Sequence, residues 1–122
     1  MCQEFDIKSD IIPRIATCFG GGIGNSGDVC GAVVGAVMAI GLVRKQSTSV
    51  EEWLETAKAA RSFRHRFEEE MGTISCRELT KLDLTSVDGR ELLMDSDVAM
   101  TVCFPAVANA FQIVMELLKE EN

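Results

Sequence analysis

Histidine is almost absent from this sequence, and its scarcity argues against several classes of enzyme. His65 is the only histidine among the 122 residues. No HExxH motif, Ser-His-Asp arrangement or paired catalytic acid is recognisable. His65 also lacks a second ligand residue at helical spacing, which argues against a metal site centred on it. An enzyme acting on a small substrate is therefore the least supported class.

Positive charge and long hydrophobic runs are also scarce. The chain has 12 Lys and Arg against 19 Asp and Glu, a net charge of −7, which argues against binding nucleic acid or anionic membranes. The uncharged run of residues 30–43 ends at Arg44 and Lys45, short of the about 20 apolar residues of a membrane-spanning helix. No hydrophobic signal region follows Met1, so we expect a cytoplasmic protein without membrane insertion.

The run of residues 30–43 is expected to organise the fold. It is too long for a strand and is typical of a helix buried on most of its circumference. Gly31, Gly35 and Ala39 recur every fourth residue, so they should form a smooth stripe where another backbone packs closely. We expect residues 1–122 to form a single all-α domain, a bundle of about five helices around this Gly/Ala-rich central helix.

The remaining helices are predicted from caps and periodicity. A first helix over residues 10–18 should turn Ile11, Ile12 and Ile15 to the core. A long helix over residues 50–71 begins at the capping box of Ser49 and Glu52 and ends at Gly72. Shorter helices are expected after a Thr73 cap and over residues 89–96, and the last helix starts with Pro105.

Residues 20–27 form a glycine-rich loop. Its string GIGNSG, residues 22–27, matches the dinucleotide-binding pattern GxGxxG, but a helical pattern rather than a strand precedes it. The favoured interpretation is a tight loop that sets Cys18 and Cys30 near one another. The backbone N–H groups of Gly21, Gly22 and Gly24 could also donate hydrogen bonds to an anion or to the sulfur atoms of an iron–sulfur cluster.

Five cysteines in a reducing compartment indicate catalytic, metal-binding or inert thiols rather than a disulfide framework. Cys30, Cys76 and Cys103 each fall at a predicted helix start, with Cys30 in the first turn after a Ser26 cap. Such a position lowers the pKa of a thiol and favours the thiolate. Their spacing matches no CxxC zinc motif, so any shared site must be assembled by the fold. The alternative is that they are small buried residues.

A basic cluster, Arg61, Arg64, His65 and Arg66, precedes Glu68, Glu69 and Glu70 on the long helix. The favoured interpretation is a solvated face with pairs such as Arg64 and Glu68. The functional alternative is a site for an anion or an acidic partner.

Three segments together resemble a known family. They are CGAVVG at residues 30–35, SCREL at residues 75–79, and Cys103. The chain resembles, over roughly residues 3–119, the C_GCAxxG_C_C family of redox-active proteins, and the resemblance implies a helical fold with redox chemistry at the cysteines. In that family the first cysteine lies upstream of the residues that resemble residues 4–17. The fourth cysteine of the site is therefore expected to be Cys18, or as second choice Cys2, unless a truncated start has removed it or this member has lost the redox function.

Two classes of function follow. In the first, Cys30, Cys76, Cys103 and Cys18 form a catalytic or metal-binding thiolate site. This site would hold an iron–sulfur cluster or a soft metal ion, or would cycle between dithiol and disulfide. The protein would then be an oxidoreductase or electron-transfer protein with a redox partner protein. In the second, the domain is a non-catalytic binding or assembly module, such as a homodimer formed through the small-residue helix surface, and its cysteines are structural.

Overall fold

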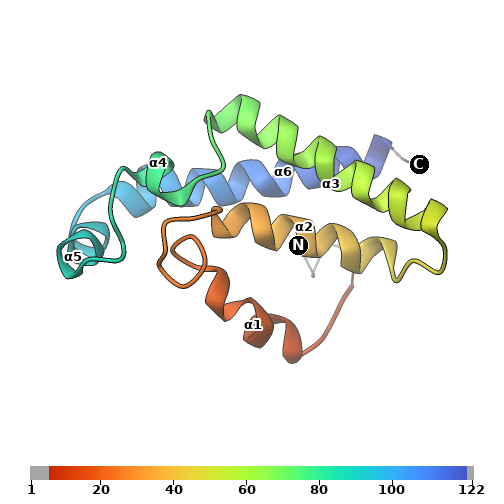
Figure 1. Cartoon of the computed structure of the whole chain (residues 1–122), viewed down its shortest axis with the longest axis horizontal. Coiled ribbons are helices and arrows are strands. Elements are labelled where there is room, and N and C mark those ends of the chain that lie inside the picture. Colours follow the sequence, from red (N-terminus) through yellow and green to blue (C-terminus); the bar gives the residue numbers. More distant parts are fainter. Residues whose placement is uncertain (1–5, 121–122) are drawn as a thin grey trace.

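The structure, a computed structural model, describes residues 6–120, and in this range the chain forms six α-helices and no strand. The expectation of an all-α fold is confirmed. Helices α2 (Gly31–Arg44), α3 (Val50–Met71) and α6 (Phe104–Glu120) run alongside one another and pack pairwise (Figure 1). The short helices α4 (Cys76–Thr80) and α5 (Val87–Asp95) lie at one end of this group, and α1 (Ile11–Ala16) lies beside α2 (Figure 1).

The core lies between the three long helices. Phe63 and Phe67 of α3 are fully buried, and their ring centroids are 6.0 Å apart. They pack with side chains of α2 and α6, among them Ile40, Ala106, Ala110, Ile113, Val114 and Leu117. Val107 and Phe111 of α6 are not part of this core and line a cavity instead.

Helix α3 has the predicted bounds and caps. The Ser49 hydroxyl accepts a hydrogen bond from the Glu52 backbone N–H at 3.1 Å. At the other end Gly72 adopts φ +90°, and its N–H donates to the Glu68 carbonyl at 2.8 Å. Both ends are therefore specified by residues within one turn of them.

The predicted starts of α2 and α4 are wrong. Cys30 is itself the N-cap of α2, so it does not lie in the first turn after Ser26. The cap of α4 is Ser75 rather than Thr73, because the Ser75 hydroxyl accepts from the Glu78 N–H at 3.2 Å. Residues 75–78 repeat the S-x-x-E pattern of Ser49 and Glu52, a signal that was present in the sequence.

The last helix does not begin at Pro105. A π-helical segment, η3 (Ala99–Cys103), runs directly into α6, and the Phe104 N–H donates to the carbonyl of Ala99, five residues back. Proline lacks a backbone donor and its ring collides with the carbonyl four residues earlier, so a widened turn before Pro105 accommodates it. Cys103 therefore lies inside a continuous helix and not at a helix start.

The combined helix Ala99–Glu120 has 22 residues and is long and apolar enough to cross a membrane, by length and composition only. The core helix of a water-soluble protein passes the same criterion, and six residues of α6 are buried within the protein. The criterion is therefore weak support for a membrane span.

On the predicted small-residue stripe of α2, another backbone comes close at Gly31 but not at Gly35. A Cβ atom at Gly31 would lie 2.9 Å from the Phe19 carbonyl oxygen, so the backbone before α2 does approach closely there. A Cβ atom at Gly35 would have no neighbour within 4 Å. Ile11 and Ile15 of α1 are 59% and 57% exposed, so α1 does not supply the expected core packing above this stripe.

Alanine substitutions at these two glycines should have opposite effects. Gly31→Ala should lower the free energy of unfolding by about 1–3 kcal/mol, because the new methyl group overlaps the Phe19 carbonyl. Gly35→Ala should raise it by about 0.5–1 kcal/mol, because alanine is the better helix former and meets open space. Urea denaturation of both variants measures the difference, and equal destabilisation of the two would contradict this packing.

Candidate functional site

An isolated antiparallel bridge between Val29 and Ser75 joins two segments that are distant in sequence. The Cys30 N–H donates to the Ile74 carbonyl at 2.7 Å, and the Cys76 N–H donates to the Asp28 carbonyl at 2.7 Å. Each cysteine thus follows a bridge residue and begins or caps a helix. The bridge places the N-terminal ends of α2 and α4 side by side.

Cys30 and Cys76 are not directly opposite one another in the register of the bridge. Cys30 lies opposite Ile74, so Cys76 is two positions further along the partner segment and on the same face. Such diagonal neighbours have Cα atoms about 7–8 Å apart and Cβ atoms somewhat closer. A disulfide needs Cβ atoms about 3.5–4.5 Å apart. Both cysteines are free in this structure, and if the two segments kept the spacing of a regular ladder, a Cys30–Cys76 disulfide would require the backbone to move.

The glycine-rich loop packs against Cys76. Gly22 is buried with φ +72°, and a Cβ atom there would lie 2.7 Å from the Cys76 Cβ and 2.6 Å from the Asp28 nitrogen. Only a residue without a side chain fits this approach. The glycine at this position therefore allows the loop to close over the start of α4.

Most amides of the loop are already paired. The Gly24 N–H donates to the Cys18 carbonyl at 2.8 Å, so the expectation that this amide is offered to a ligand is wrong. The N–H groups of Ile23 and of residues 25–28 also donate to carbonyls within the loop or just before it. Gly21 and Gly22 donate none of these loop hydrogen bonds, and both line a cavity.

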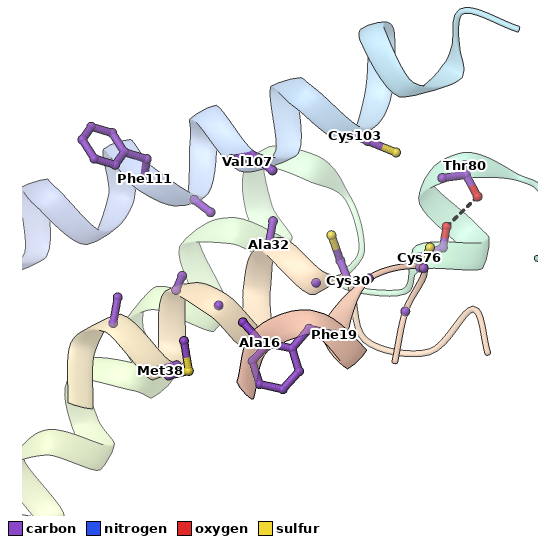
Figure 2. Close-up of a pocket in the computed structure, with 18 of the residues that line it drawn as sticks. Ala16, Phe19, Cys30, Ala32, Met38, Cys76, Thr80, Cys103, Val107 and Phe111 are labelled. Carbon is purple, nitrogen blue, oxygen red and sulfur yellow. Dashed lines mark hydrogen bonds between the residues drawn. The ribbon is translucent and has the colours of Figure 1, made fainter. Parts of the chain in front are cut away.

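Three cysteines from three elements reach that cavity. Its volume is about 560 Å³, and it lies between the glycine-rich loop, α1, α2, α4 and α6. Figure 2 shows Cys30 at the start of α2, Cys76 at the start of α4 and Cys103 before α6 around a shared space. Together with Thr80 they form what we call the thiol end of the cavity. The structure thus brings together three of the four predicted site cysteines.

Electrostatic coupling connects these thiols. Burial raises the pKa of Cys76, and the neighbouring Cys30 and Cys103 raise it further, while the Thr80 hydroxyl acts in the opposite direction. Burial and Cys30 also raise the pKa of Cys103. The expected lowering of the pKa by a helix start is therefore wrong for both cysteines. At Cys76, desolvation and neighbouring thiolates outweigh the effect of the helix end, and Cys103 does not lie at a helix start.

Cys18 is placed differently from the other three. It lies in the 3₁₀ turn η2 (Thr17–Phe19), is exposed, and is not among the residues that line the cavity. The loop therefore does not bring Cys18 to the thiol end. Cys2, the second choice for a fourth ligand, lies outside the described residues.

The thiol end does not match the site of a single metal ion. Within residues 6–120, no three His, Cys, Asp or Glu side chains are placed so that they could hold one ion. A zinc ion would need its thiolates about 2.3 Å from the metal, which draws the sulfurs close together. The three thiols line a cavity of about 560 Å³, which is much larger than a single ion.

Thr80 is the site residue that sequence reasoning missed. It is a buried polar residue, and its hydroxyl donates to the Cys76 carbonyl at 2.8 Å one turn earlier (Figure 2). The hydroxyl also accepts from the Leu82 N–H at 3.2 Å. The four-residue spacing from Cys76 was the available signal, because it places both residues on one face of a helix.

The two other candidate sites find no support. The basic cluster is largely paired on the surface. Arg64 lies 3.6 Å from Glu68, His65 lies 3.0 Å from Glu69, and Arg66 forms two hydrogen bonds with Glu120. The GxGxxG string follows the helical turn η2, and no strand precedes it in the described chain. The cluster is thus the predicted solvated face, and the loop lacks the context for dinucleotide binding.

Comparison with known proteins identifies related sequences. A sequence model of the family described as "Putative redox-active protein (C_GCAxxG_C_C)" matches residues 1–117. A protein of Archaeoglobus fulgidus named "Uncharacterized protein" is 32% identical over 119 residues, which is 89% of this chain and 72% of that protein. No solved structure matches the chain. The family match includes all three cavity cysteines.

The contact between the loop and Cys76 can be isolated with two matched variants. Gly22→Ala and Gly24→Ala both place alanine at positive φ, +72° and +59°. Each should cost about 1–2 kcal/mol for the left-handed backbone. Gly22→Ala should cost at least about 1 kcal/mol more, because its methyl group displaces Asp28 and Cys76. Chemical denaturation measures the two costs, and equal values would contradict the close approach.

The raised thiol pKa values predict a pH dependence of stability for the reduced protein in the presence of a chelator. Thiols of the unfolded chain titrate near about 8.5, whereas burial keeps Cys76 and Cys103 protonated to higher pH in the folded state. The free energy of unfolding should therefore fall as pH rises above about 8.5, because the unfolded state releases these protons first. The urea midpoint should show this fall, and Cys76→Ala with Cys103→Ala should flatten it. An unchanged slope in that double variant would contradict the assignment.

Proposed function

Since this chain belongs to the C_GCAxxG_C_C family, described as redox-active, we propose that it is an electron-transfer protein whose cysteines ligate an iron–sulfur cluster. The cluster ligands would be Cys30, Cys76 and Cys103. The observation that carries the proposal is the convergence of three thiols, from three separate elements, on one cavity. Cys30 raises the pKa of both Cys76 and Cys103, and Cys103 raises that of Cys76, which supports the same proximity.

The spacing of the thiols favours a cluster over the other two thiolate chemistries. Cys30, Cys76 and Cys103 are all free cysteines, and the diagonal register of Cys30 and Cys76 across the bridge is wider in a regular ladder than a disulfide needs. A single ion is not served by any three side chains as they stand in the described residues. A cluster is wider than one ion and has thiolate ligands at several metal atoms, so it suits sulfurs set around a larger space.

Iron–sulfur clusters are commonly held by four cysteine thiolates, and the cavity cysteines would provide three of them. Cys18 would reach the cavity only if η2 moved, so we propose ligation by three cysteines from this chain. The amides of Gly21 and Gly22 lie at the cavity wall and would donate hydrogen bonds to cluster sulfurs. The cluster would supply one-electron transfer, and hydrogen bonds and burial would set its potential.

The chain's own residues would prepare the site in two ways. Burial and coupling raise the pKa of Cys76 and Cys103 and keep both protonated in the absence of metal, so loading must release these protons and should be favoured at higher pH. Cys30 and Cys103 are only partly buried, which leaves an approach for a redox partner protein at the thiol end.

Metal analysis of protein purified without oxygen tests the proposal. We expect iron and acid-labile sulfide in comparable amounts, and each of Cys30→Ser, Cys76→Ser and Cys103→Ser should reduce iron to less than about half. Cys18→Ser is the matched control and should retain the iron, because Cys18 lies outside the cavity. A protein without iron or sulfide after reconstitution, with slowly reacting thiols, would instead support the non-catalytic helical module.

A further inference from the structure

The cavity continues well beyond the three thiols. On α2 its wall runs from Gly31 to Leu42, which is about 16 Å along a helix at 1.5 Å per residue. We call the part of the cavity away from the thiols the apolar arm. Its walls include Ile12 and Ala16 of α1, Gly35, Met38, Ala39 and Leu42 of α2, and Phe111 of α6.

Among the residues that the structure describes, no charged side chain lines the cavity. Apart from the three cysteines, the only polar side chain in this described lining is Thr80, and these four residues lie together at the thiol end. Moving an ion into such surroundings costs several kcal/mol unless a partner charge is present. The apolar arm therefore cannot favour phosphates, nucleotides or carboxylates, and it suits an uncharged molecule.

The side chains of α1 and α2 do not fill the apolar arm. No residue of α1 is buried, although the helix carries three isoleucines. Across from it, a Cβ atom at Gly35 would meet nothing within 4 Å. A helical glycine costs about 0.5–1 kcal/mol relative to alanine, and no contact in the described chain requires one at this position. The described side chains therefore leave the space between α1 and α2 incompletely filled.

We propose that the apolar arm binds an uncharged, flat aromatic molecule between α1 and α2. The short side chains of Ala16, Gly35 and Ala39 give smooth walls, and Met38 adapts to aromatic surfaces. The whole cavity, of which the apolar arm is one part, has a volume of about 560 Å³, within the range of about 300–1,000 Å³ that is usual for small-molecule sites. The inference does not depend on the iron–sulfur cluster, because the arm lies away from the thiols.

Two fluorescent probes with one skeleton test the charge requirement on the full-length protein. N-phenyl-1-naphthylamine is uncharged, and 8-anilino-1-naphthalenesulfonate adds one negative charge. We expect saturable, one-to-one binding of the uncharged probe and at least about tenfold weaker binding of the sulfonate, equivalent to about 1.4 kcal/mol. Equal affinities, or no saturable binding of the uncharged probe, would overturn the proposal.

Two leucine variants on α2 test the location. Gly35→Leu places a side chain in the apolar arm, whereas Gly41→Leu places it in open space outside the cavity. Both replace a helical glycine by a better helix former, so neither should lower the melting temperature. Gly35→Leu should weaken probe binding at least about tenfold, and Gly41→Leu should change it less than about twofold. Equal binding by the two variants would overturn the location.

Two further measurements separate this proposal from its alternatives. Sedimentation shows whether the protein is a dimer, and a dimer that dissociates only in Gly35→Leu would assign the apolar arm to a second copy of the chain and overturn the proposal.

The iron content of Gly35→Leu should equal that of the unaltered protein, because Cys30, Cys76 and Cys103 remain in place. Probe binding that persists in a protein without iron supports the arm independently of the cluster.

Discussion

The backbone hydrogen bonds between residues 27–30 and 74–77 are the constraint on which the rest of the site depends. They join two segments separated by the whole of α2 and α3. Because Cys30 and Cys76 each follow a bridge residue, a few backbone bonds place both thiols on one face. The same bonds hold the glycine-rich loop against α4, and the absence of a side chain at Gly22 permits that contact. Thiols that are distant in sequence thereby share one cavity.

The bridge positions Cys30 and Cys76, and the three-helix core positions the third cysteine, Cys103. The core of α2, α3 and α6 sets the position of α6, and the widened turn before Pro105 carries Cys103 to the thiol end. Helix α1 contributes little to that core, so a space remains between it and α2. The molecule therefore combines a well-packed centre with an open, uncharged cavity at its flank. Because protein interiors are normally close-packed, such a cavity is a candidate binding site, and both proposals place their ligand in it.

The outcome at individual residues shows which predictions rest on local physics. Ser49 and Gly72 delimit α3 as expected, because capping depends on residues within one turn. The family resemblance is also confirmed, because the family model matches residues 1–117. Several predictions that required knowledge of spatial neighbours were wrong. Desolvation raises the thiol pKa values, the Gly24 amide is paired, and Ile11 lies on the surface.

By itself the sequence determined the helical class and the caps of α3, because both depend on short-range periodicity and on residues within one turn. It also determined the need for glycine in the loop, through backbone sterics, and the family, through a pattern of residues. The tertiary structure alone decided which cysteines meet, in which direction burial shifts their pKa values, and where a cavity remains. Those properties arise from the bridge of Val29 with Ser75 and from the packing of α6. Both join residues that are far apart in the chain, so no local pattern encodes their distances.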